Sequence, residues 1–184
     1  MCKDIKVCLR IIFVEVRIVG LDLAGKEKNP TGFCLLKIEG KRRSSECWIL
    51  YKDEEILRKI KEIKPKVVCI DAPFSYPKNG YFRKCDLELI KKGFRCLSPL
   101  FPGVKILVER ARNLVREINK VDERIEVIEV FPRATEKILG LKKGKRVNKD
   151  KYDALLCAIT GEFYLKGNFE RIGDEKEGLI IIPK

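Results

Sequence analysis

The sequence contains no histidine among its 184 residues. This absence excludes zinc sites of the Cys/His type, histidine general bases and Ser-His-Asp triads. Any hydrolytic chemistry must therefore depend on carboxylates, a metal ion, lysine, cysteine or tyrosine. Eight cysteines are present, but none forms a Cys-x-x-Cys pair. Cys34, Cys69 and Cys157 lie inside apolar runs, which is typical of buried thiols.

Long apolar runs are also missing, and none approaches the ~20 residues that a membrane helix requires. Glu15 and Arg17 interrupt the apolar patch at residues 11–14, and no small-residue cleavage site follows it, so we expect no signal peptide. These absences predict a soluble, cytoplasmic protein without a membrane partner.

The chain lacks internal repeats, low-complexity tracts and Pro/Gly-rich linkers, so we expect a single domain over residues 16–184. Residues 1–15 show no pattern that joins them to the rest of the sequence. They are interpreted as an N-terminal extension: an extra strand, a disordered tail or the product of a wrongly assigned start codon.

Acidic residues are few compared with basic ones: 27 Asp and Glu residues stand against 40 Lys and Arg residues, a formal net charge of +13. Such an excess favours an anionic partner, most commonly nucleic acid. The same Lys/Glu/Ile-rich composition is also typical of heat-adapted proteins from thermophiles, which gives the charge a second explanation.

Much of the basic charge gathers in one segment between residues 137 and 151, where Asp150 is the sole acid. Gly140 and Gly144 indicate a mobile loop. Such a loop either binds a phosphate backbone or is an ordinary solvated segment. The candidate nucleic-acid-binding residues of this segment are Lys142, Lys143, Lys145, Arg146 and Lys149.

Strands are expected first at residues 17–23, 31–38 and 44–51, with turns between them, which is the spacing of an antiparallel meander. A helix capped by Asp53 follows, then a β-branched strand at 67–70 that should be buried on both faces. The later pattern predicts helices at 83–92, 104–119 and 150–165, a strand at 125–131, and a final strand at 178–182 paired with 169–172.

Three meandering strands followed by a helical crossover to parallel strands are typical of a ribonuclease-H-like fold, whereas a doubly wound fold would alternate from the start. The predicted fold class is therefore α/β and ribonuclease-H-like. Its mixed sheet, an antiparallel meander plus parallel strands, would be flanked by helices and followed by a C-terminal helix and a short hairpin.

Two carboxylates carry the functional argument. Asp22 ends the first strand and Asp71 ends the fourth, so parallel pairing would bring both to one sheet edge. Carboxylates beside a dry core are costly unless they are paired or bind metal, and two held close raise one another's pKa unless a cation lies between them. Oxygen ligands select Mg²⁺ or Mn²⁺. The alternative is that each aspartate only forms a turn.

Three further acids are candidates. Glu129 shares the apolar face of its strand, so it is either a neighbour of the metal site or a partner for Arg133. Asp150 and Asp153 open the last long helix, three residues apart. Asp150 suits the N-cap or first turn. Asp153 is the better candidate ligand, because its turn faces the protein.

The loop after Asp71 is rich in aromatic residues: Tyr76, Tyr81 and Phe82 precede Arg83. Loop aromatics near a catalytic edge either stack on unpaired bases or cover the core. The sequence leaves both readings open.

Five motifs together resemble the domain of unknown function 429 family, a group described as predicted nucleases of RNase H fold. They are residues 19–25 (VGLDLAG), 70–75 (IDAPFS), 83–86 (RKCD), 129–134 (EVFPRA) and 153–158 (DALLCA). The resemblance runs from about residue 17 to the C-terminus.

Two fragments also resemble Holliday-junction resolvases, in which acids end the first and fourth strands and a helix of the Asp-x-x-Asp-Ala-Leu type supplies the rest. Asp22, Asp71, Asp150 and Asp153 fall on those positions. The fourth-strand acid is usually Glu in that group and is Asp71 here, which implies different metal distances.

The leading hypothesis is hydrolysis of DNA or RNA phosphodiester bonds by two Mg²⁺ or Mn²⁺ ions. Asp22 would bridge the ions, Asp71 and Asp153 would each bind one, and Glu129 or Asp150 would orient a ligand or water. The basic segment, with Arg83 and Arg133, would hold the nucleic-acid backbone.

Two other hypotheses remain. The chain could be a non-catalytic nucleic-acid-binding module, which salt-dependent binding without metal-dependent cleavage would select. It could also handle phosphate as actin-like ATPases do, but those need two such domains and this chain has room for one, so we expect no nucleotide cofactor. The assembly is expected to be a monomer or a homodimer.

Overall fold

The computed structural model describes residues 15–184. All of the predicted N-terminal extension except Glu15 lies outside the described residues. The elements in chain order are β1 (Val16–Asp22), β2 (Thr31–Glu39), β3 (Arg42–Leu50), α1 (Asp53–Ile63), β4 (Val67–Asp71), α2 (Lys84–Lys91), α3 (Pro102–Val121), β5 (Glu126–Val130), α4 (Pro132–Ile138), α5 (Lys149–Leu165), β6 (Phe169–Asp174) and β7 (Gly178–Pro183).

The strands form one seven-stranded sheet in the order β3-β2-β1-β4-β5-β7-β6. β1, β2 and β3 are an antiparallel meander. β4 pairs parallel to β1, β5 to β4, and β7 to β5, and β6 closes the sheet as the antiparallel arm of a hairpin. The predictions of an α/β fold, a meander joined to parallel strands, and a C-terminal hairpin are confirmed.

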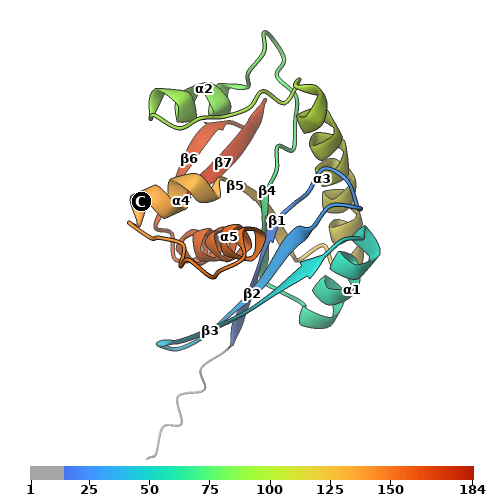
Figure 1. The fold of residues 1–184 in the computed structure, drawn as a ribbon, viewed down its shortest axis with the longest axis vertical. Coiled ribbons are helices and arrows are strands. Elements are labelled where there is room, and N and C mark those ends of the chain that lie inside the picture. Colours follow the sequence, from blue (N-terminus) through green and yellow to red (C-terminus); the bar gives the residue numbers. More distant parts are fainter. Residues whose placement is uncertain (1–14) are drawn as a thin grey trace, which may run out of the picture.

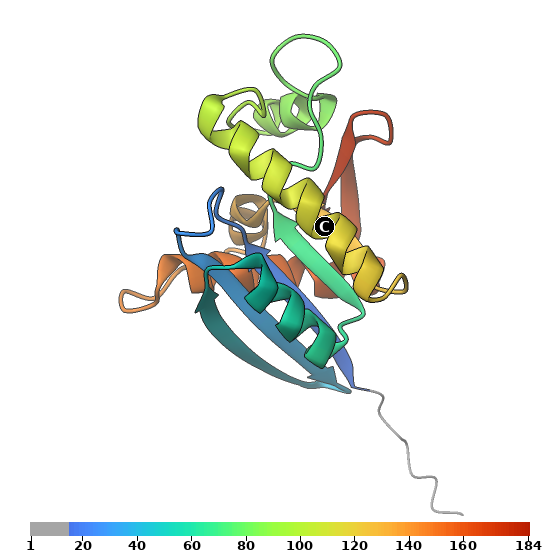
Figure 2. The same cartoon turned by 90° about the vertical axis from the view of Figure 1, so that its right-hand side faces the viewer.

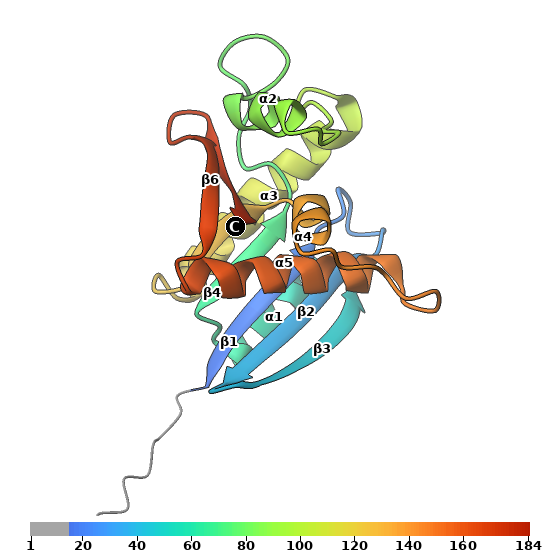
Figure 3. The ribbon, with the colours of Figure 1, turned by 90° about the vertical axis from the view of Figure 1, so that its left-hand side faces the viewer.

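Helices cover both faces of the sheet (Figure 1). α1 and α3 lie in front of one face (Figure 2), and α5 crosses the other (Figure 3). Neighbouring residues of one strand therefore serve different cores: Val68 packs with α1 and α3, whereas Val67 and Cys69 pack with α5. The predicted burial of β4 on both faces is confirmed, and its apolar run follows from that burial.

Two local predictions are corrected. Asp53 is the first residue of α1 and not its N-cap, which is Lys52. The carboxylate of Glu55 accepts the backbone N–H groups of Tyr51 and Lys52, both at 3.0 Å. The side chain of Asp53 instead accepts from Arg110 of α3 at 2.8 Å, so it ties α1 to α3.

Helical spacing in the sequence predicts that Leu155, Leu156, Ile159 and Phe163 face inward from α5, and of these only Leu156 is fully buried. Leu155, Ile159 and Phe163 are only partly buried, whereas small residues of α5 face the sheet. The helix lies so close to the strands that large side chains do not fit between them. The buried small residues are Ala154, Cys157, Ala158 and Gly161.

None of the helices within residues 15–184 has the length and apolarity needed to cross a membrane.

Candidate functional site

The site begins where β1 and β4 end. Asp22 and Asp71 are register partners on these adjacent parallel strands, each following a fully buried residue, Leu21 and Ile70. Both aspartates line a cavity of about 520 Å³ at this edge of the sheet. The predicted meeting of the two strand-end carboxylates is found, and it follows from parallel pairing in this register.

The two carboxylates are held where ionisation is unfavourable. Burial raises the pKa of Asp22 to about 6, and Asp153 and Asp150 add to the rise, while Lys149 and Arg133 oppose it. Burial, followed by the charges of Asp22 and Asp153, raises the pKa of Asp71 well above its ordinary value, and Lys149 opposes this shift too. Three aspartates therefore repel one another here, and the Lys149 ammonium moderates them.

Lys149 and Asp153 form a direct ion pair. The Lys149 Nζ lies 3.0 Å from the Asp153 Oδ2, with one helical turn between the two residues. Asp153 is mostly buried, whereas Lys149 is exposed. Lys149 was a candidate for binding nucleic acid, but its ammonium serves as a counter-charge to the acids in this structure.

The N-cap of α5 is not Asp150, which was one of the two places that the sequence allowed for this residue. Asn148 is the N-cap, and its side chain accepts the Lys151 backbone N–H at 3.0 Å. Asp150 therefore lies in the first turn, the second of the two places the sequence allowed, where the helix dipole favours a negative charge.

Glycines let α5 approach the strands. A Cβ added at Gly20 of β1 would overlap the Ala154 carbonyl oxygen and the Ala158 nitrogen, and one at Gly32 of β2 would overlap the Asp150 carbonyl oxygen. Gly32 is also the register partner of Asp22. These contacts bring the first turns of α5 against the end of β1. Sequence reasoning missed both residues, although a glycine inside a strand is a signal of close backbone approach.

We expect Gly20→Ala to lower the free energy of unfolding by about 1–2 kcal/mol, because the new methyl group meets helix backbone that must move away. Urea denaturation followed by circular dichroism measures the change. Gly25→Ala is the matched control, since its Cβ would lie 3.6 Å from the nearest atom, and it should change stability by less than about 0.5 kcal/mol. Equal stability of the two variants would show that α5 is not in such close contact.

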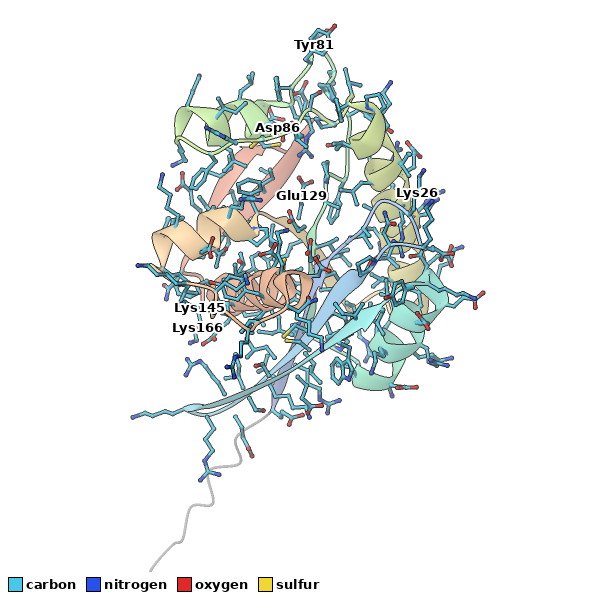
Figure 4. All side chains as sticks on the ribbon, in the orientation of Figure 1. Lys26, Tyr81, Asp86, Glu129, Lys145 and Lys166 are labelled. Atoms are coloured by element: carbon cyan, nitrogen blue, oxygen red, sulfur yellow. The ribbon has the colours of Figure 1, made fainter. Side chains whose placement is uncertain are left out.

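Glu129 belongs to a buried ion-pair network. It accepts from Arg83 Nη2 at 2.7 Å and Nη1 at 2.9 Å, and from the Phe74 backbone N–H at 2.9 Å. Arg83 also pairs with Asp86 at 2.9 Å, and its side chain is only 1% exposed. Figure 4 labels Asp86 on α2 and Glu129 on β5.

This network corrects one of the two alternatives for Glu129 and places Arg83. The partner of Glu129 is Arg83 and not Arg133. Both Glu129 oxygens are engaged by Arg83, and Glu129 also lines the cavity with Asp22 and Asp71, so it is a neighbour of the candidate site. Arg83 is only 1% exposed and pairs with two carboxylates, so its charge is balanced inside the protein at the wall of the cavity.

The basic residues between α4 and α5 are exposed and precede the helix that carries Asp150 and Asp153. Figure 4 labels Lys145 there. Arg133 is exposed in the first turn of α4 and lines the cavity with the two aspartates. The exposed residues of the segment are Lys142, Lys143, Lys145, Arg146 and Lys149.

The acids of the site lie close enough to affect one another's pKa, but they are not arranged as a complete set of metal ligands. Within residues 15–184, no group of three or more cysteine, aspartate or glutamate side chains is arranged to hold a metal ion. Asp22 and Asp71 face the cavity together, while the carboxylate of Asp153 is engaged with Lys149. An ion held by all three acids would compete with Lys149 for the Asp153 carboxylate.

A scan against models of known protein families finds no match for this chain. A search of curated proteins finds no match either. The resemblance of the five motifs to the domain of unknown function 429 family, and that of two fragments to resolvases, therefore stay predictions.

Proposed function

We propose that this chain is a metal-dependent nuclease with a ribonuclease-H-like fold, which hydrolyses phosphodiester bonds of DNA or RNA using Mg²⁺ or Mn²⁺. The observation that carries the proposal is the pairing of Asp22 with Asp71 at the ends of adjacent parallel strands, beside a cavity. Both carboxylates have raised pKa values, which is the condition that a bound cation relieves.

The strand order supports the fold assignment. An antiparallel meander β3-β2-β1 continues into the parallel strands β4 and β5, the order that the sequence predicts for a ribonuclease-H-like domain. The hairpin β6–β7 extends the sheet beyond that core.

The residues present fit a hard divalent cation in charge and donor type. Asp22, Asp71 and Asp153 offer oxygen ligands, which Mg²⁺ and Mn²⁺ prefer. The Lys149 ammonium already acts as a positive charge among them, which is the role that an ion would take over. When bound, the metal supplies an activated water and stabilises the leaving oxyanion.

The chain's own residues have separate tasks in this proposal. Asp22 and Asp71 would hold the cation from the ends of β1 and β4, and Asp153 would supply a third carboxylate. Asp150, in the first turn of α5, orients water. Arg133 and the basic segment bind phosphates, which position the substrate without reading its sequence.

The test is cleavage of labelled DNA and RNA oligonucleotides, single-stranded and duplex, with Mg²⁺, with Mn²⁺ or with EDTA. We expect cleavage only with metal, and a loss of roughly 100-fold or more in Asp22→Asn and in Asp71→Asn. Asp122→Asn is the matched control. Asp122 is the C-cap of α3, does not line the cavity, and pairs with the exposed Arg124. Cleavage by Asp22→Asn at the wild-type rate would remove the proposal.

One observation favours a second function. Asp153 is held by Lys149, and no complete set of metal ligands is arranged within the described residues. A non-catalytic nucleic-acid-binding module would need neither a free Asp153 carboxylate nor a complete set of metal ligands. Salt-dependent binding with no cleavage under any metal condition would select this alternative.

The role of Lys149 gives a prediction that does not depend on activity. Lys149→Gln should bind Mn²⁺ about two- to fivefold more tightly than the wild type, because the ion no longer competes with an ammonium for Asp153. Titration followed by electron paramagnetic resonance measures free Mn²⁺. Lys145→Gln, which removes the same charge from the exposed segment, should change the affinity less. Weaker binding by Lys149→Gln than by Lys145→Gln would contradict this role.

A further inference from the structure

The cavity has a second wall, whose residues have no role in the proposed metal site. It is formed by residues 72–104, the segment between β4 and the first residues of α3 that contains α2, which we call the cap segment. Figures 1 and 2 show α2 and its flanking loops standing beyond the end of β4. The side chains of this wall and of α3 that line the cavity include Arg95, Cys96, Leu97, Val104 and Leu107.

Two positive charges in this cavity are open to a ligand. The charge of Arg83 is balanced by Glu129 and Asp86 inside the protein. Arg95 and Arg133 line the cavity from different elements, the cap segment and α4, and both are exposed. An anionic group in this cavity would therefore have two guanidinium groups available, and guanidinium groups bind phosphate with matching geometry.

The cap segment also carries the most exposed large apolar side chains of the described chain. These are Tyr81 at 75%, Leu97 at 69% and Phe101 at 58%. The Ser98 hydroxyl donates to the Tyr81 carbonyl oxygen, which joins the loop of Tyr81 to the loop of Leu97. Figure 4 labels Tyr81 at the far end of the molecule, beyond the sheet. These exposed apolar side chains belong to the segment that forms one wall of the cavity, and Leu97 lines the cavity itself, which is typical of a binding surface.

We propose that the cap segment binds single-stranded nucleic acid, with one nucleotide in the cavity. The phosphate lies between Arg95 and Arg133, and the base lies on Leu97, Val104 and Leu107. The following bases pack on Tyr81 and Phe101. This inference rests on the proposed nuclease function and specifies its substrate class.

The chemistry favours an unpaired strand over a duplex. A cavity of about 520 Å³ lies in the size range of pockets that enclose one small molecule. Bases in a duplex are already stacked on both faces, so an apolar surface gains little from them. Unpaired bases present free faces, and stacking on aromatic side chains with a basic groove for the backbone is how single strands are bound.

The test is fluorescence anisotropy in EDTA, where binding is measured without cleavage. Three probes share one length of about 12 nucleotides: a single strand, the same strand with abasic sites throughout, and a duplex. We expect the base-bearing strand to bind at least about fivefold more tightly than the abasic strand. Equal binding of these two probes, or tighter binding of the duplex, would overturn the inference.

Variants separate the two kinds of contact. Tyr81→Ala and Phe101→Ala should each weaken the base-bearing strand about fivefold and leave the abasic strand unchanged. Arg95→Ala should weaken both strands alike. Tyr51→Ala, which removes an exposed tyrosine that does not line the cavity, is the matched control. If Tyr81→Ala and Phe101→Ala behave like this control, the cap segment does not contact bases.

The outcomes keep this inference apart from the proposed function. Base-dependent binding without metal-dependent cleavage would support the inference and remove the nuclease proposal. Metal-dependent cleavage with equal binding of base-bearing and abasic strands would do the reverse.

Discussion

Arg83→Met is expected to lower the free energy of unfolding by about 3–5 kcal/mol and the melting temperature by roughly 10 °C. Methionine is of similar length but carries no charge, so Glu129 and Asp86 would be left as buried carboxylates without their partner. Both are at most 5% exposed, which denies them compensating water. Thermal and urea unfolding measure the loss.

Arg124→Met is the matched control for this prediction. Arg124 also pairs with an aspartate at 2.8 Å, but its side chain is 85% exposed, so losing the pair should cost less than about 1 kcal/mol. The double variant Arg83→Met, Glu129→Met should recover part of the loss, since it removes one of the stranded charges. A loss in Arg83→Met no larger than that in Arg124→Met would mean that the network contributes little to stability.

Asp22→Asn is expected to have opposite effects on stability and activity. In EDTA at pH 7–8 it should raise the free energy of unfolding by on the order of 2 kcal/mol, which corresponds to roughly 4–8 °C in melting temperature. The reason is that burial and Asp153 make the ionised Asp22 unfavourable in the folded chain. The same substitution removes a proposed metal ligand and therefore cleavage.

The pH dependence follows from the direction of the shift. The pKa of Asp22 is about 6 in the folded chain and 3.8 is its ordinary value. A raised folded pKa adds stability below pH ~4, and this contribution is lost as the pH rises from 4 to 6. The difference in stability between Asp22→Asn and the wild type should therefore grow over that interval and then stay constant.

Asp122→Asn is the control, and its expected change in the free energy of unfolding has the opposite sign to that of Asp22→Asn. Its bonds with Arg124 lower the pKa of Asp122 to about 2, so the ionised form stabilises the fold above its ordinary pKa. Replacing it should slightly destabilise the protein at neutral pH.

Adding Mg²⁺ should raise the melting temperature of the wild type and of Asp122→Asn, but not that of Asp22→Asn. Lower stability of Asp22→Asn than of the wild type in EDTA would contradict the claim that the ionised Asp22 carboxylate destabilises the folded chain.

Local patterns predicted the strands well because their causes are local. β-Branched runs and turn residues set where a strand begins and ends, so the expected strand at 31–38 is found as β2 (Thr31–Glu39). Asp22 and Asp71 were placed at strand ends by the same signals, and parallel pairing then made them neighbours. Boundaries that depend on capping were less certain from sequence, as Asp53 and Asn148 illustrate.

The errors arose where a contact joins distant segments. Arg133, four residues away, was one of two alternatives for Glu129, but the partner is Arg83, which is 46 residues distant and reaches it from the start of α2. The inward face of α5 was assigned to large apolar residues, but Gly20 and Gly32 on two strands select small ones. No periodicity within one helix or strand contains that information.

The sequence alone determined the chemistry that this protein has at its disposal: no histidine, acids at strand ends, and a basic segment before the last long helix. Side-chain identity and short-range spacing are sufficient for these features. The tertiary structure alone decided which of the charges at the cavity neutralise one another: Glu129 pairs with Arg83, whereas no such arginine pairs with Asp22 or Asp71 among the described residues. Burial and pairing depend on segments that meet only after folding, and they set the cost of each charge.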